Sequence, residues 1–416
     1  MGILNLLDVS TNFIDFAVDP INIKSLNWLG KIIQWLIEGV GIVGLGVILF
    51  TLILKTVVLP LDVYSRVKMK KQSLLMESMR PQMEKLQKQY ANDKAMYSQK
   101  VMELQKANGI SMFGACLPMI ITLIIFMTVF SSFSTYSQYA NLSTYNDMVN
   151  AYNISVNEFV IDVNGTAEDN ANRFLKAETD NSLGMTAYLV DFEAFEAVSG
   201  KKLDGANEAE NMKIVRDYVR EHARKSAADY YRSNRNDFLW VGNIWYPDSL
   251  LNKEVPNFSK FSSAISRAMG SGLENSYEES YDEVTYYLRW DGYKNDAGKL
   301  EGKVYNGYFV LIVLAIGLMF FQQFITMRAQ KASSELGTVD GSGARTNKWM
   351  LIMMPIIYGV FSFFYSAAFS LYMITNTLYG LITTVIINKL MDVSFAKHGA
   401  EGLAKKRGQN NRKRLK

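Results

Sequence analysis

The chain has 416 residues, of which 49% are hydrophobic and 20% are charged, and its formal net charge is +4. Long apolar runs alternate with strongly charged stretches, which excludes a single water-soluble core and predicts an all-α polytopic membrane protein. The one cysteine, Cys116, lies inside an apolar run, so an internal disulfide and a thiolate metal cluster are excluded.

The N-terminal segment, residues 1–38, is predicted to lie on the exterior side and to end in an amphipathic helix. It is a poor signal peptide, because it lacks a basic start and carries Asp8 and Asp15. Residues 25–38 place Trp28 and several aliphatic side chains on one helical face. We expect this helix to lie in the outer interface of the membrane. The alternative is a simple extension of the first span.

Five apolar runs have the length that a helix needs to cross the hydrocarbon core of a bilayer. They are residues 39–61, 112–133, 306–327, 349–369 and 371–391. The last two are joined by a tight turn around Tyr365–Ser370, and the sequence leaves the boundary between them open.

The charges of the connecting segments predict the orientation of these spans. Basic residues outnumber acidic ones by ten to five in 62–108, by four to two in 328–348 and by nine to two in 389–416. Residues 136–305 carry eighteen basic and twenty-seven acidic residues instead. The positive-inside rule therefore predicts an N-terminus outside and a C-terminus in the cytoplasm, which requires an odd number of spans.

Residues 62–108 are predicted to form a cytoplasmic helical hairpin. Pro81 suggests a break between two helices, since proline suits the first position of a helix, and Asp93 is the expected N-cap of the returning helix. A thin apolar seam is expected between the two arms, formed by Met83, Leu86, Tyr90, Met96, Val101 and Leu104.

Residues 136–236 are predicted to be a separate exterior domain, mainly α or α+β. Within it, 141–170 is expected to form loops and short strands, because Asn, Gly and Asp are frequent there. Residues 210–234 are expected to form a helix. The following segment, 237–305, begins with a cluster of aromatic residues and is predicted to lie at the outer interface.

The motifs that would indicate an enzyme are missing, and we expect neither catalytic residues, a metal site nor a cofactor. The two histidines, His222 and His398, lack the spacing of metal ligands. No glycine-rich phosphate loop and no nucleophile elbow can be recognised.

Lys55 is the residue in the first span that most needs an explanation. It lies seven residues before Asp62, about 10 Å below the cytoplasmic end of the span, and a lysine stem reaches about 6 Å. Snorkelling to the headgroups is therefore one explanation, and a hydrated cavity open to the cytoplasm is the other. Polar residues of other spans that could line such a cavity include Thr122, Gln322, Gln323, Ser366 and Ser370.

Several stretches together resemble the YidC family of membrane-protein insertases. They are LKTVVLPL (54–61), residues 79–126, FLWVGNIWYPDSL (238–250), GLMFFQQ (317–323) and residues 354–389. The resemblance implies five helices around a hydrophilic groove that is open to the cytoplasm and to lipid. It places Lys55 where the family carries an arginine, and residues 136–236 have no recognised counterpart.

The resemblance also implies the function of a membrane-protein insertase and chaperone in the bacterial cytoplasmic membrane. Hydrophobic segments of nascent membrane proteins would pass through the groove into the lipid bilayer, without nucleotide. The hairpin residues Pro81, Met83, Leu86 and Met96 would receive the substrate. A partnership with the Sec translocon is left open.

The basic tail, 392–416, has two interpretations of equal weight: anchoring by the positive-inside rule and contact with the ribosome. The residues concerned are Lys405, Lys406, Arg407, Arg412, Lys413 and Arg414. Two other functions remain as alternatives for the whole chain. One is a small-anion transporter or channel that uses Lys55 as its binding charge, and the other is a receptor that acts through 136–305.

Overall fold

The computed structural model describes most of the chain. The described residues are 13–14, 16, 18–108, 112–180, 185–204, 207–251, 253–266, 268–269, 276–289, 293–294, 300–301, 305–335 and 342–414. The chain folds into two compact units. The insert unit comprises the described residues of Met1–Asn27, Ser134–Asn236 and Leu251–Asn306, and the bundle unit comprises those of Trp28–Phe133, Asp237–Leu250 and Gly307–Lys416.

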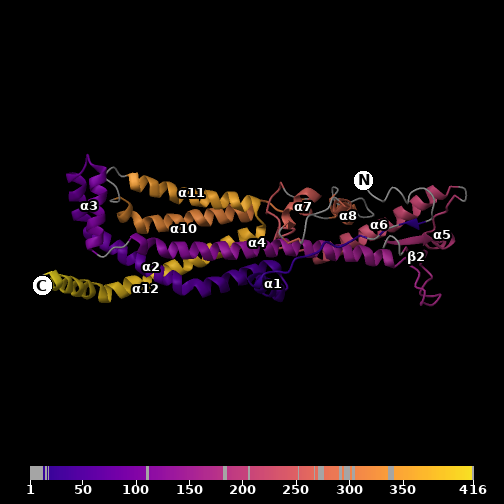
Figure 1. Ribbon diagram of the computed structural model, residues 1–416, viewed down its shortest axis with the longest axis horizontal. Helices are drawn as coiled ribbons and strands as arrows, with labels where there is room; N and C mark the ends of the chain where they lie inside the picture. Colours follow the sequence, from indigo (N-terminus) through magenta and orange to yellow (C-terminus); the bar gives the residue numbers. More distant parts are fainter. Residues whose placement is uncertain are drawn as a thin grey trace. The chain divides into compact units, whose positions relative to one another are not determined.

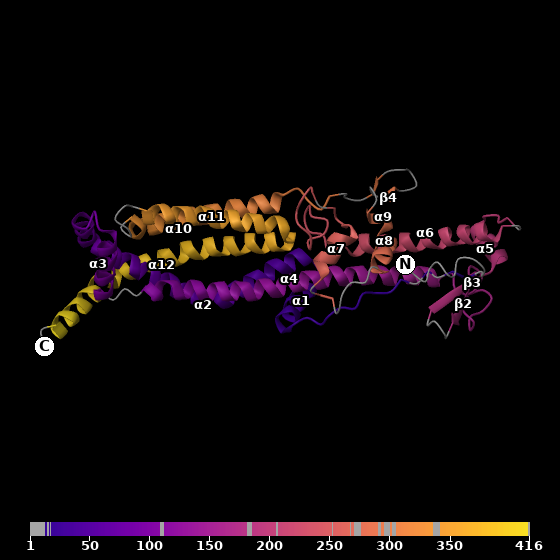
Figure 2. The ribbon, with the colours of Figure 1, turned by 45° about the horizontal axis from the view of Figure 1, so that its top comes forward.

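The bundle unit consists of long helices. They are α1 (Trp28–Val40), α2 (Val43–Gln89), α3 (Lys94–Ala107), the first part of α4 (Met112–Asn157), α10 (Val310–Glu335), α11 (Ser342–Phe364) and α12 (Ala367–Arg414). Helix α10 packs beside α11 and α12, and α2 packs beside α12 and α1 (Figures 1 and 2). The prediction of a mainly helical fold is confirmed for this unit.

Each of the five predicted spans lies largely within one of these helices. Among the described residues, two helical stretches are long and apolar enough to cross a membrane, Val43–Lys68 and Ala367–Met391. Two shorter apolar stretches, Val310–Ile325 and Pro355–Phe364, lie in α10 and α11. Five membrane crossings therefore remain a prediction.

The amphipathic helix α1 is separate from the first predicted span. Gly41 adopts a left-handed conformation with φ +77°, and α2 begins two residues later rather than at residue 39. A side chain at Gly46 would place its Cβ 2.6 Å from the Cα of Ile37, so α1 folds back closely onto α2. A simple extension of the span is therefore wrong, because a glycine reverses the chain where other residues would be strained.

The helical hairpin differs from the prediction in two places. Pro81 lies inside α2, which continues to Gln89, so the expected break at Pro81 is wrong. Asp93 is the N-cap of α3, as predicted, and its Oδ1 accepts a hydrogen bond from the Met96 N–H at 2.9 Å. Met96 itself is exposed, and Tyr97 is buried in the seam where Met96 was expected. The buried seam consists of Met79, Met83, Tyr97 and Val101, flanked by Leu86, Tyr90 and Leu104.

The turn between the last two predicted spans lies at the start of the expected stretch Tyr365–Ser370, so the last helix begins earlier than residue 371. Helix α11 ends at Phe364 and α12 begins at Ala367. The first backbone N–H groups of α12 are satisfied from another segment, since Ala367 donates to the carbonyl of Tyr246 at 2.8 Å. This contact also explains why residues 237–250 belong to the bundle unit.

The insert unit has an α+β fold. It contains the second part of α4, α5 (Phe192–Ser199), α6 (Glu208–Asn234), α7 (Phe258–Ile265), α8 (Ser276–Val284) and α9 (Tyr286–Arg289). Its antiparallel sheet has the order β1 (Phe13–Ile14), β3 (Met185–Val190), β2 (Leu175–Asp180). A two-stranded sheet joins β4 (Tyr293–Lys294) and β5 (Leu300–Glu301).

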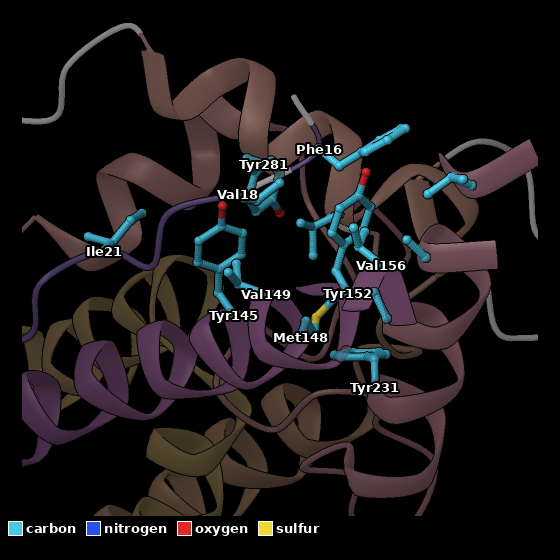
Figure 3. Packing of buried hydrophobic residues seen from close by; sticks show 14 of the residues in the cluster. Phe16, Val18, Ile21, Tyr145, Met148, Val149, Tyr152, Val156, Tyr231 and Tyr281 are labelled. Atoms are coloured by element: carbon cyan, nitrogen blue, oxygen red, sulfur yellow. The ribbon is translucent and has the colours of Figure 1, made fainter. Parts of the chain in front are cut away.

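The hydrophobic core of the insert unit is built around α4 and α6. Residues 141–157 form part of α4, so the expectation of loops and strands over 141–170 is wrong for this stretch. Figure 3 shows side chains of α4 and of the N-terminal segment 16–21 in one cluster. The buried positions on α4 are Leu142, Tyr145, Met148, Val149, Tyr152 and Val156. They recur every three or four residues, which is the periodicity of a buried helical face.

The insert unit also differs in extent from the predicted domain 136–236. Residues 251–306, which the sequence suggested as part of an interfacial segment, pack into the same core through Phe261, Ile265 and Tyr281. The N-terminal residues Phe16 and Val18 pack there too. Contacts between residues so far apart in sequence cannot be read from local periodicity.

Candidate functional site

Three charged residues form a line along one face of α2. Lys55, Asp62 and Arg66 are separated by seven and four residues, and these spacings bring side chains back to the same side of a helix. We call this row the charged stripe. All three residues lie within the stretch Val43–Lys68, which is long and apolar enough to cross a membrane.

An ion pair lies at the end of this span that is predicted to face the cytoplasm. It also contacts a second helix. The Oδ2 atom of Asp62 lies 2.9 Å from Nε of Arg66, and both side chains are half-buried. Arg66 also donates from Nη1 to Oγ1 of Thr384 on α12 at 2.6 Å. The guanidinium therefore links α2 to α12, and two separate partners hold it in place.

Polar groups of α2 and α10 also lie against α12 at Tyr379 and Gly380, five and four residues before Thr384. Oγ1 of Thr56 on α2 lies 3.4 Å from the hydroxyl of Tyr379 on α12. On the next residue of α12, a Cβ added to Gly380 would lie 3.1 Å from Nε2 of Gln322 on α10. We call Thr56, Gln322, Tyr379 and Thr384, together with the charged stripe, the polar layer.

Lys55 lies within this layer, next to Thr56, and its side chain is half-buried. A lysine at the centre of a membrane-spanning helix costs about 2.5–3.5 kcal/mol on insertion scales. Asp62 attracts the ammonium and Arg66 repels it. The carboxylate and the neighbouring hydroxyl and amide groups offset part of that cost.

The structure divides the predicted groove residues into two sets. Gln322 lies beside Gly380 of α12, and Gln323 is a half-buried neighbour on α10. Ser366 and Ser370 precede Tyr379 by thirteen and nine residues, so they lie about 20 and 14 Å away along α12. That these serines share a site with Lys55 stays a prediction. The side chain of Thr122 lies outside the described residues.

The two serines have structural surroundings of their own. Ser366 accepts a long hydrogen bond from the Phe369 N–H at 3.4 Å, at the first turn of α12. Ser370 is fully buried, and its hydroxyl has no hydrogen-bond partner within the described part of the chain. The side chains of the predicted ribosome-binding tail lie outside the described residues, although α12 continues through it to Arg414.

Asp62, Arg66, Tyr379 and Thr384 were missed by the sequence reasoning. The spacing of Lys55, Asp62 and Arg66 would have identified the charged stripe as a helical face. No local pattern, by contrast, indicates which residues of α12 lie opposite this face, because that depends on the packing of two helices.

The opposite ends of α10 and α12 are held by residues 237–250. Asp248 is fully buried, and its two carboxylate oxygens accept hydrogen bonds from the backbone N–H groups of Tyr308 and Leu311, both at 2.7 Å. The indole N–H of Trp240 donates to the same carboxylate at 3.3 Å. Asp248 thus satisfies N–H groups at the start of α10 that have no partner within that helix.

Comparison with known proteins identifies the family. The family described as 60Kd inner membrane protein matches residues 35–167 and 231–394 of this chain. These ranges contain the polar layer, the hairpin and the Asp248 segment. The unmatched internal segment is therefore 168–230, which is shorter than the predicted insertion 136–236.

Curated relatives of the chain carry the name membrane protein insertase YidC. A protein of Caldanaerobacter subterraneus subsp. tengcongensis is 31% identical over 116 residues, which are 28% of this chain and 54% of that protein. One of Jannaschia sp. is 36% identical over 107 residues, 26% of this chain and 16% of that protein. One of Fusobacterium nucleatum is 35% identical over 91 residues, 22% of this chain and 42% of that protein.

These relatives are matched over about half of their length or less. The family match, however, covers well over half of this chain and both of its candidate membrane-spanning stretches. The chain therefore belongs to the YidC family of inner membrane proteins and is a protein of the bacterial cell membrane.

Proposed function

We propose that this protein is a membrane-protein insertase and chaperone, and that the polar layer is where it receives the polar part of its substrate. The observation that carries the proposal is the charged stripe on a helix long enough to cross a membrane, with Arg66 bonded to Thr384 of α12. Crossing hydrocarbon is costly for a hydrophilic chain. A polar layer partway across shortens the apolar path and so lowers that cost.

The charges of the stripe favour acidic substrates. Lys55 and Arg66 are cations and Asp62 is an anion, so the stripe carries one net positive charge. An acidic residue in the translocated tail of a substrate would be attracted to it, more strongly than in water because the surroundings are apolar. The attraction would weaken as the acidic residue moves past the stripe towards the other side of the membrane, so it would not trap the substrate.

The surfaces of α10 and α12 suit the exit of an apolar segment into lipid. Both helices expose large hydrophobic side chains, which are Val313, Leu314, Phe320, Phe321 and Phe324 on α10 and Leu378, Ile382, Val385 and Ile386 on α12. Exposed apolar surface of this kind suits contact with lipid or with another apolar chain. We propose that the substrate leaves the polar layer along these two helices.

The rest of the proposed arrangement follows the charge distribution and the family. Five helices cross the membrane, with the N-terminus outside and the C-terminus in the cytoplasm. The hairpin formed by the end of α2 and by α3 receives the nascent chain. The basic end of α12 contacts either the ribosome or anionic lipid, and the Sec translocon is a candidate partner.

Proteoliposomes that contain only this protein test the proposal. A single-span substrate with a short acidic tail is synthesised in their presence, and insertion is measured by protection of the tail from protease. We expect insertion by the wild type, a several-fold loss for Lys55→Ala and a smaller loss for Lys55→Arg, since arginine keeps the charge. The matched control is Lys31→Ala, which removes an exposed lysine of α1.

Two outcomes would contradict the proposal. Failure of the wild type to protect any of several acidic-tailed substrates would remove the insertase function. Equal activity of Lys55→Ala and wild type with all of them would leave an insertase but would remove the role of the cationic site.

A further inference from the structure

Asp62 is the one acidic member of the charged stripe, and the proposed function gives it no part. It lies between the two cations, seven residues after Lys55 and four before Arg66. A seven-residue separation corresponds to about 10.5 Å along a helix. The lysine stem of about 6 Å covers much of that distance. The carboxylate therefore acts on both cations, through a 2.9 Å contact with Arg66 and through its field at Lys55.

Arg66 is held in the layer even without Asp62. Its Nη1 atom donates to Oγ1 of Thr384 at 2.6 Å, and this bond does not involve the carboxylate. Replacing Asp62 by asparagine keeps the size of the side chain and an oxygen that can accept a hydrogen bond from Arg66. We therefore expect the substitution to remove one negative charge and to leave the guanidinium bonded to Thr384.

We propose that Asp62 sets the charge specificity of the substrate site. It neutralises Arg66, so that Lys55 supplies the net positive charge and the site takes translocated tails with a single acidic residue. A tail with several acidic residues meets the carboxylate as a like charge and is disfavoured. This inference rests on the proposed insertase function, and it adds the substrate class that the site prefers.

The test compares three substrates that differ only in their translocated tail, which carries no, one or three acidic residues. Insertion of each into proteoliposomes is measured for wild type, Asp62→Asn, Asp62→Glu, Lys55→Gln and the double variant Asp62→Asn with Arg66→Gln. The readout is the ratio of insertion of the three-acid tail to that of the neutral tail. A ratio cancels differences in the amount of correctly folded protein.

We expect Asp62→Asn to raise this ratio about two- to fivefold, the range that a single partly solvated charge interaction produces. Asp62→Glu keeps the charge and should retain the wild-type ratio. The double variant restores one net positive charge and should return the ratio to the wild-type value. A rise that also shrinks at high salt supports an electrostatic origin.

The possible failures are distinguishable. An unchanged ratio in Asp62→Asn, together with a lowered ratio in Lys55→Gln, overturns the inference and leaves the proposed function intact. An unchanged ratio in both variants overturns the role of the cationic site itself. A double variant that behaves like Asp62→Asn shows that Arg66 is not the cation that Asp62 neutralises, which also overturns the inference.

Discussion

The side-chain amide of Asn146 on α4 pairs with both backbone polar groups of Ile21. The Ile21 N–H donates to Oδ1 at 2.9 Å, and Nδ2 donates to the Ile21 carbonyl at 2.8 Å. Asn153 holds Val18 in the same way, at 3.2 and 2.8 Å. Seven residues of helix rise about 10.5 Å and three residues of extended chain span about 10 Å, so the two spacings match.

The first prediction concerns this attachment of the N-terminal segment. Asn146→Ala should destabilise the insert unit by about 1–3 kcal/mol, because two backbone groups of Ile21 lose their partners near a buried core. Amide hydrogen exchange of the full chain in detergent should show faster exchange over residues 18–23.

The matched control for this prediction is Asn150→Ala, which removes an exposed asparagine from the same helix. It should leave the exchange of residues 18–23 unchanged. Similar exchange in Asn146→Ala and in the control would mean that the N-terminal segment is held by its apolar side chains alone.

The second prediction compares two buried tyrosines of α4. The Tyr152 hydroxyl donates to Glu283 at 3.0 Å, whereas the Tyr145 hydroxyl is buried without a hydrogen-bond partner among the described residues. Tyr152→Phe should lower the unfolding free energy by about 1 kcal/mol, and Tyr145→Phe should leave it unchanged or raise it. Urea unfolding followed by tyrosine fluorescence measures both. Equal losses would contradict the assignment of partners.

A third prediction follows from the ionisation of the same two residues. Burial raises the pKa of Tyr145, and burial together with the neighbouring Glu283 raises the pKa of Tyr152. A raised pKa means that the unfolded chain loses these protons first as the pH rises. The stabilisation is therefore complete below about pH 10, the ordinary pKa of tyrosine, and is lost above it.

Melting temperatures measured between pH 8 and 11 check this dependence. We expect the melting temperature to fall above pH 10, and to fall less steeply in Tyr145→Phe, which lacks one of the two ionisable groups. A slope that is the same in wild type and Tyr145→Phe would show that other groups cause the alkaline loss.

The fourth prediction concerns the start of α10. Asp248→Ala removes the acceptor of two backbone N–H groups and should cost about 2 kcal/mol, the upper range for the loss of a helix cap. Gly307→Ala should disturb the same cap, because the added Cβ would overlap Oδ1 of Asp248. Limited proteolysis near residue 307 is the measurement. Resistance equal to wild type in both variants would show that the cap does not hold this end of α10.

The fifth prediction uses a pair of glycines near the α1–α2 reversal. Gly46→Val should loosen α1, since its Cβ would lie 2.6 Å from the Cα of Ile37, whereas Gly39→Ala meets no atom within 4 Å. A spin label attached in the Trp35→Cys variant reports how mobile α1 is. Loosening by both substitutions, or by neither, would contradict the close contact.

The sequence alone was sufficient for much of this protein. Hydrophobic runs of spanning length, the Asp93 cap and most of the hairpin seam follow from periodicity and from local hydrogen bonds within a few residues. The family also followed from motifs that lie within continuous stretches of the chain. These features depend on neighbours in sequence, so a single sequence contains them.

Only the tertiary structure decided the features that join distant residues. The helical stretch 141–157 was missed because its polar composition obscured a buried face that is visible once α6 packs against it. The residues of α12 that meet Thr56 and Arg66 are Tyr379 and Thr384, and this level of contact depends on helix packing and not on residue type. The partners of Asp248, Asn146 and Arg66 lie 60, 125 and 318 residues away. Such contacts form because folding must satisfy buried polar groups, and a local pattern does not specify which distant group will do so.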